Sequence, residues 1–122
     1  MTQEDKQLLL KDLCARLPYA LQVRNPRLDG PDYATDIDTE TWKLQVLYNG
    51  YTDDIEKFKP YLRPMSSMTE EELEEFHNYT NIDPISWLHC AIDWLNAHYF
   101  DYRGLIPMGL ALEVTEENNP YK

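Results

Sequence analysis

Hydrophobic residues recur with helical spacing at the start of the chain and with strand spacing near its middle. Residues 2–16 place leucines on one stripe, with Thr2 suited to the N-cap and Pro18 positioned to end the helix. Residues 41–48 alternate apolar and polar side chains, and Asn49-Gly50 follows them directly. Because both residues tolerate positive φ, this pattern predicts a strand followed by a hairpin turn.

The segment 24–40 carries few large apolar side chains and several carboxylates, which is typical of a loop or an edge strand. Asp36, Asp38 and Glu40 alternate along it. Calcium loops also alternate carboxylates, but they need a glycine at the bend and a later bidentate glutamate, which this segment does not place correctly. An edge strand protected by charge is therefore the favoured interpretation.

Two further helices are predicted in the C-terminal half of the chain. Thr69 and Glu72 have the spacing of a capping box, and Leu73 and Phe76 are expected to face inward. Asp83-Pro84 then pairs an N-cap with proline at the first helical position.

The helix that follows, to about residue 98, has two apolar stripes and is expected to be largely buried. Asp101 is predicted to cap a short turn that ends at Gly109, and residues 110–114 alternate like a final strand.

These elements predict an α+β fold with an N-terminal helix, a small antiparallel sheet and two C-terminal helices packed on one face. The length of 122 residues suits one domain, assigned to residues 1–114. Residues 115–122 are predicted to be a flexible tail.

The chain is strongly acidic, with 22 acidic and 11 basic side chains and a formal net charge of −11. Such a surface is repelled by phosphate backbones and anionic membranes, so direct nucleic-acid or membrane binding is disfavoured. Residues 64–102 hold eight carboxylates and no lysine or arginine, which favours a protein partner with a basic surface. With no signal-like or membrane-spanning run, a cytoplasmic location is expected.

Cys14 and Cys90 are the two cysteines, and each lies in a predicted helix among apolar residues. Free thiols are expected, without a disulfide framework. His89 and Asp93 have helical metal-ligand spacing but lack further ligands, so a surface hydrogen-bonded pair is favoured. No metal and no cofactor is predicted.

The candidate interaction residues are acidic or aromatic. Glu71, Glu74 and Glu75 form either a docking face for a basic partner or a solvated face that complements the helix dipole. Trp87 and Trp94 lie seven residues apart on one line of their helix, where core packing competes with a dimer patch or a partner groove.

A polar cluster follows the last helix. His98 and Asp101 suggest a general-base pair, with Arg103 positioned to hold an anion. No nucleophile motif or glycine-rich phosphate loop accompanies them, and Arg103 also has a structural use in neutralising Asp101 or binding helix-end carbonyls. No catalytic residue is therefore assigned, and a non-enzymatic role is favoured.

Three runs of the sequence, 4–19, 59–72 and 93–113, resemble a group of small acidic proteins encoded by gut anaerobic bacteria, often in phage or other mobile-element settings. The group has no established activity, so the resemblance implies a genomic context and no site residue. That context favours an accessory or host-interaction role.

Three functions remain open from the sequence. The leading one is a non-enzymatic, acidic protein-interaction module. The second is a small-ligand binder or enzyme that uses His98, Asp101 and Arg103. The third is a structural homodimer through Trp87 and Trp94.

Overall fold

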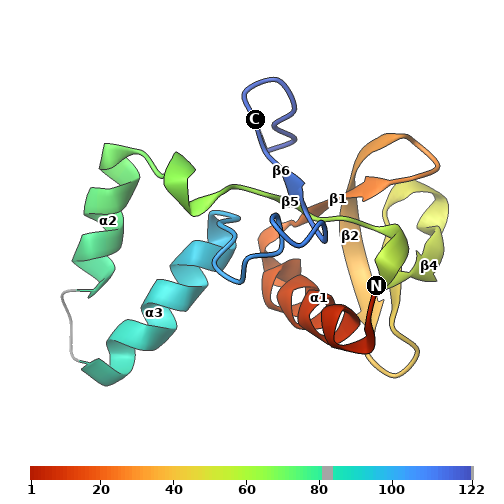
Figure 1. The fold of residues 1–122 in the computed structure, drawn as a ribbon, viewed down its shortest axis with the longest axis horizontal. Coiled ribbons are helices and arrows are strands. Elements are labelled where there is room, and N and C mark those ends of the chain that lie inside the picture. The colour runs from red at the N-terminus through yellow and green to blue at the C-terminus, as the bar shows by residue number, and fades with distance from the viewer. Residues whose placement is uncertain (81–83, 122) are drawn as a thin grey trace.

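A computed structural model describes the backbone of residues 1–80 and 84–121 and the side chains of residues 1–78 and 89–121. It confirms the α+β class, with an N-terminal helix, a four-stranded antiparallel sheet and further helices (Figure 1). The elements occur along the chain in the order α1 (Gln3–Arg16), η1 (Leu17–Tyr19), β1 (Gln22–Asn25), β2 (Gly30–Asp38), β3 (Lys43–Val46), η2 (Tyr48–Gly50), β4 (Thr52–Asp54), η3 (Ile55–Lys57), β5 (Tyr61–Leu62), η4 (Met65–Ser67), α2 (Glu70–Thr80), α3 (Pro84–Ala97) and β6 (Leu112–Glu113).

The N-terminal helix begins and ends where its capping residues dictate. The Thr2 hydroxyl accepts the Asp5 amide while the Asp5 carboxylate accepts the Thr2 amide, which completes a capping box. The helix ends at Arg16, and Pro18 lies in the 3₁₀ turn that follows.

The four strands follow the order β1-β2-β3-β4, and every neighbouring pair is antiparallel. The hairpin at Asn49-Gly50 is present, and both residues have positive φ. The strand before it is shorter than predicted, because Trp42 also takes a left-handed conformation (φ 57°) and Tyr48 begins the turn.

The prediction of a loop or edge strand for residues 24–40 is wrong for residues 30–38, whereas residues 24–25 lie in the edge strand β1 and residues 26–29 and 39–40 form turns. This segment contains β2, the longest strand, which pairs with both β1 and β3. Its buried positions are Asp32 and Ala34, and a bulge between Ala34 and Asp36 interrupts the alternation. Because the inward-facing residues of β2 are small or polar, the hydrophobic pattern of the sequence did not indicate an internal strand here.

The main hydrophobic core lies between α1 and the sheet. Leu9 and Leu13 of α1 pack with buried side chains from β1, β3 and β5, including Val23, Leu44 and Leu62. A second, smaller cluster centres on Trp94, Leu95 and Phe100, with Met68, Phe76 and Tyr102 against it.

Helices α2 and α3 pack on each other and lie beside the sheet (Figure 1). Helix α1, in contrast, packs against the sheet and shares its hydrophobic core. The capping box of Thr69 and Glu72 at the start of α2 is present. Leu73, predicted to face inward, is 44% exposed, because α2 packs mainly against α3 and not against the sheet. The N-cap predicted at Asp83 lies outside the described residues.

The predicted last strand also forms, but in a separate place. β6 pairs in parallel with β5 and makes a second, two-stranded sheet, so it does not extend the first one. Residues 60–63, which include β5, therefore contact three parts of the fold. Pro60 bridges to Val23 of β1, β5 pairs with β6, and Arg63 bridges to Phe100 after α3.

Within residues 115–122, which were predicted to be a flexible tail, residues 119–121 dock on the fold, because Tyr121 is held against β1. Its hydroxyl accepts the Gln22 amide (3.1 Å) and lies 2.9 Å from the Tyr61 carbonyl, and its ring stacks on Tyr99 with centroids 3.7 Å apart. Burial raises the pKa of the Tyr121 hydroxyl. An aromatic ring with a satisfied polar end explains why this segment docks.

Replacing Tyr121 with phenylalanine is expected to lower the free energy of unfolding by about 1–3 kcal/mol, because the Gln22 amide loses its recorded acceptor. Urea unfolding measures this loss. Tyr48→Phe is the matched control, since Tyr48 is 47% exposed and its hydroxyl makes no hydrogen bond among the described residues. Equal effects of the two substitutions would contradict the assigned role of the Tyr121 hydroxyl.

Candidate functional site

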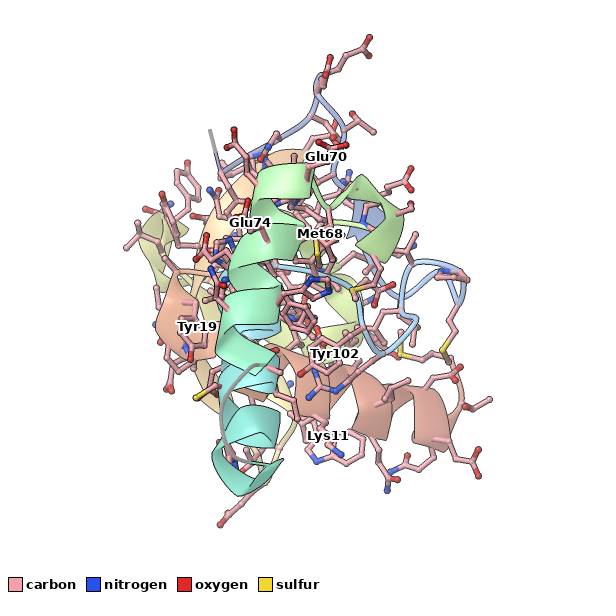
Figure 2. All side chains as sticks on the ribbon, turned by 90° about the vertical axis from the view of Figure 1, so that its left-hand side faces the viewer. Lys11, Tyr19, Met68, Glu70, Glu74 and Tyr102 are labelled. Atoms are coloured by element: carbon pink, nitrogen blue, oxygen red, sulfur yellow. The ribbon has the colours of Figure 1, made fainter. Side chains whose placement is uncertain are left out.

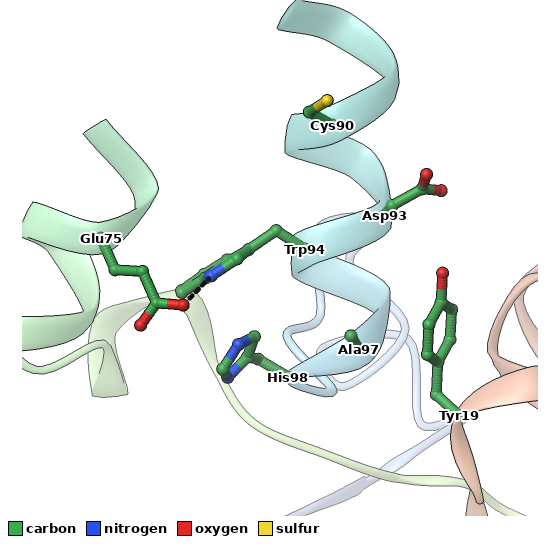
Figure 3. A pocket seen from close by; sticks show the side chains of 7 residues that line it. All are labelled: Tyr19, Glu75, Cys90, Asp93, Trp94, Ala97 and His98. Carbon is green, nitrogen blue, oxygen red and sulfur yellow. Dashed lines mark hydrogen bonds between the residues drawn. The ribbon is translucent and has the colours of Figure 1, made fainter. Parts of the chain in front are cut away.

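A shallow trough runs along one face of α3, with a volume of about 330 Å³ (Figure 3). Helix α2 contributes one wall, the turn η1 contributes the other, and α3 contributes the floor. We call this hollow the α3 trough, and it is lined by Tyr19, Glu75, Cys90, Asp93, Trp94, Ala97 and His98.

The floor of the trough follows from helical spacing. Cys90, Trp94 and Ala97 are separated by three or four positions, so they share one face of α3, and Asp93 lies at the edge of that face. Cys90 and Ala97 are small, which leaves room above the helix. Across two helical turns this floor is about 10 Å long.

Trp94 lies beneath the floor of the trough, and most of its side chain is buried. It is 5% exposed, and its ring packs against Phe76, His98 and Phe100 with centroid distances of 5.4, 4.1 and 5.7 Å. Its indole nitrogen donates to a Glu75 carboxylate oxygen at 3.0 Å (Figure 3). The bond fixes the Glu75 carboxylate on the wall contributed by α2.

The rims of the trough are acidic. Glu75 and Asp93 are exposed, and no ion pair neutralises either of them among the described residues. The Tyr19 hydroxyl is directed toward the Asp93 side of α3 (Figure 3). The trough therefore combines two carboxylates, a phenol and a small apolar floor.

The charges of the chain are unequally divided between its two parts. Residues 1–63 carry nine basic and eleven acidic side chains, whereas residues 64–122 carry two basic and eleven acidic ones. Arg103 is one of those two cations, and its guanidinium is engaged by Asp12 at 2.7 Å. Six of the seven residues that line the trough lie in the more strongly acidic part, residues 64–122.

A charged clamp holds the start of α2 beside the trough. Arg63 donates two hydrogen bonds to Glu72, at 2.7 and 2.6 Å, and its guanidinium lies 4.2 Å from the centre of the Phe100 ring. The Arg63 guanidinium lowers the pKa of Glu72 to about 2. His98 Nδ1 lies 3.8 Å from Glu72, so the trough, through His98, borders this clamp.

The predicted interaction residues separate into two groups. Glu75, Trp94 and His98 meet in the trough. Glu71 and Glu74 are exposed on α2 outside it, and Figure 2, which faces this helix, shows Glu74 on its upper part. The side chain of Trp87 lies outside the described residues.

The structure does not assemble His98, Asp101 and Arg103 into one cluster. The Asp101 carboxylate is buried and accepts the amides of Leu105 and Ile106 at 2.8 and 2.9 Å, as predicted for a turn cap. Among the described residues, no hydrogen bond or ion pair joins it to His98 or Arg103. Each of the three side chains has a different contact. His98 stacks on Trp94, Asp101 caps the turn after α3, and Arg103 binds Asp12.

Arg103 belongs to a buried charge network that the sequence did not reveal. Asp12 accepts Arg103 at 2.7 Å and Arg16 at 2.9 Å, and both Asp12 and Arg16 are fully buried. Arg16 also donates to the Phe100 carbonyl, and both guanidiniums lie over the Tyr102 ring. This network ties α1 to the segment after α3.

Four of the residues that line the trough were not predicted as site residues: Tyr19, Cys90, Asp93 and Ala97. The sequence indicated Asp93 only as a partner of His89, in a metal site or, preferably, a surface hydrogen-bonded pair. Both side chains are exposed, and no hydrogen bond joins them among the described residues. Tyr19 carries no local signal, because it reaches the trough through tertiary packing. The helical spacing of Cys90, Trp94 and Ala97 was the available clue.

Other site classes find no support in the part of the chain that the structure describes. It contains no group of three or more His, Cys, Asp or Glu side chains arranged to hold a metal ion. Cys14 and Cys90 are free thiols, and burial raises the pKa of Cys14. None of the described helices combines the length and hydrophobicity needed to cross a membrane.

Comparisons with protein-family models, curated proteins and solved structures find no match to this chain.

Proposed function

We propose that this protein is a non-enzymatic interaction module whose α3 trough binds a basic segment of a partner protein. The observation that carries the proposal is the pair of unneutralised carboxylates, Glu75 and Asp93, above a small apolar floor. Cationic side chains complement such rims, and the floor accepts the apolar side chains between them.

The dimensions favour a peptide segment over a small cation. The trough extends over two turns of α3, enough for two turns of a docked helix. Glu71 and Glu74 extend the acidic surface along α2 beyond the trough. A segment with several lysine or arginine residues would contact both regions, whereas a single cation would contact only one.

In the two alternative functions, the key residues do not have the arrangement or exposure that each function requires. The enzyme hypothesis required His98, Asp101 and Arg103 to face one pocket, but Asp101 caps a turn and Arg103 binds Asp12. The homodimer hypothesis required an exposed Trp94, which is 5% exposed in this fold. The mobile-element origin suggested by the sequence resemblance remains a prediction, and it agrees with an accessory binding role.

Removing the rim charges is expected to weaken peptide binding. A defined amphipathic helical peptide with lysines on one face should bind the wild type, and calorimetry should show the affinity falling as salt rises. The Glu75→Gln/Asp93→Asn variant should bind at least fivefold more weakly with a smaller salt dependence. The glutamine preserves an acceptor for the Trp94 indole.

The matched control removes the same two charges elsewhere. Asp36 and Glu40 are exposed on β2 and in the turn after it, and neither side chain forms an ion pair among the described residues. The Asp36→Asn/Glu40→Gln variant should bind nearly as tightly as the wild type. If both double variants weaken binding equally, the trough is not the binding site and only the general acidic field acts.

A further inference from the structure

Residues 119–121 lie against β1 as a strap, and their contacts have the features of a specific peptide site. The Gln22 side chain donates to the Pro120 carbonyl, and the Gln22 amide donates to the Tyr121 hydroxyl. That hydroxyl also lies within hydrogen-bond distance of the Gln22 and Tyr61 carbonyls, while Tyr99 stacks on the ring. Gln22 is 7% exposed, so its polar groups depend on this strap.

Hollows flank the strap on two sides. One, of about 330 Å³, is lined by Ala20, Gln22, Tyr33, Tyr99, Pro120 and Tyr121. Another, of about 290 Å³, is lined by Pro31, Tyr61, Glu117, Asn118, Asn119 and Pro120. Pro120 borders both hollows, and between them the strap covers Gln22, Tyr61 and Tyr99. We call this covered surface, together with the two hollows, the β1 slot.

The strap is joined to the fold by an exposed turn. The Asn118 side chain accepts the Thr115 amide and hydroxyl and donates to the Glu113 carbonyl. Residues 115–118 are all exposed, so their contacts are local, and few packing interactions oppose a rearrangement of this turn.

We propose that the β1 slot also accepts the Asn119–Tyr121 strap of a second copy of this chain. An empty slot leaves the buried Gln22 amide without its recorded acceptor and uncovers the Tyr99 ring, which is unfavourable. A strap supplied by another copy restores every one of these contacts with no change in bonding. Exchange of an identical segment is a low-cost route to association.

The second copy is the occupant that the contacts identify. The slot is complementary to a proline carbonyl followed by a tyrosine, the arrangement that Pro120 and Tyr121 present. This association is independent of the α3 trough, because none of the strap residues lines that trough.

Complementation between two full-length variants tests the proposal. Tyr121→Ala removes the anchor of the strap and keeps the slot, whereas Tyr99→Ala weakens the slot and keeps the strap. Each variant alone should be monomeric by light scattering, and an equimolar mixture at high concentration should contain a heterodimer. A mixture that stays monomeric, or a dimer of Tyr121→Ala alone, overturns the proposal.

A peptide experiment decides the matter if Tyr99→Ala does not fold. A synthetic peptide of residues 115–122 should bind full-length Tyr121→Ala, and NMR should report the shift at the Gln22 amide. The same peptide with Phe in place of tyrosine should bind about tenfold more weakly, because it lacks the hydroxyl. Equal binding of the two peptides, or no binding of either, overturns the proposal.

Discussion

Asp12→Ala is expected to lower the free energy of unfolding by about 3–5 kcal/mol, the largest effect of any single substitution considered. Asp12 binds both Arg16 and Arg103, and its side chain is fully buried. Removing it leaves the Arg16 guanidinium buried without its ion-pair partner, which costs far more than the pair itself contributes. Urea denaturation followed by circular dichroism measures the loss.

Two controls separate this network from ordinary surface charge. Asp36→Asn removes an exposed carboxylate and should change stability by less than about 0.5 kcal/mol. Arg103→Met should cost less than Asp12→Ala, because Asp12 retains Arg16 and the Arg103 side chain is partly exposed. A loss below about 1 kcal/mol for Asp12→Ala would show that the buried network is not a stability determinant.

Glu72→Gln is expected to destabilise the protein by up to about 3 kcal/mol at neutral pH, with an effect that disappears in acid. The Arg63 guanidinium holds the pKa of Glu72 at about 2, against an ordinary value of 4.5. Because the folded pKa is depressed, the stabilisation is fully present above about pH 4.5 and is lost as the pH falls toward 2.

The measurement is urea unfolding of the wild type and the variant at several pH values between 2 and 7. Glu71→Gln is the matched control, since Glu71 is adjacent, exposed and without an ion pair among the described residues. The two proteins with substitutions should differ at pH 7 and converge near pH 2. A Glu72→Gln effect that is constant with pH would rule out the Arg63 pair as its cause.

Local signals in the sequence predicted local structure well. The caps at Thr2 and Thr69, the hairpin at Asn49-Gly50 and the Asp101 turn cap all involve groups within five residues of each other. Their hydrogen bonds depend on the identity of a few neighbouring residues, so they can be read from one sequence.

Long-range pairings could not be predicted in the same way. The internal strand β2 turns small and polar residues inward, so its hydrophobic pattern is weak. The Asp12–Arg103 pair spans 91 positions, and the contact of Tyr121 with Gln22 spans 99. Nothing near these residues in sequence specifies their partners.

The candidate site was predicted in part for the same reason. Glu75 and Trp94 lie on two consecutive helices and His98 directly follows the second, and their acidic and aromatic character was visible in the sequence. The opposite wall depends on Tyr19, which follows α1 and is distant in sequence. Arg103 is separated from His98 and Asp101 because it binds Asp12, a buried carboxylate that is distant in sequence.

The uneven distribution of charge gives the molecule an electric dipole whose negative end lies on the α2–α3 side. Residues 64–122 hold nine more acidic than basic side chains, whereas residues 1–63 hold two more. We expect this field to orient the cationic partner proposed above so that it meets α2 and α3 first. Salt should slow this encounter strongly, while the lifetime of the complex is governed by the close contacts made after arrival.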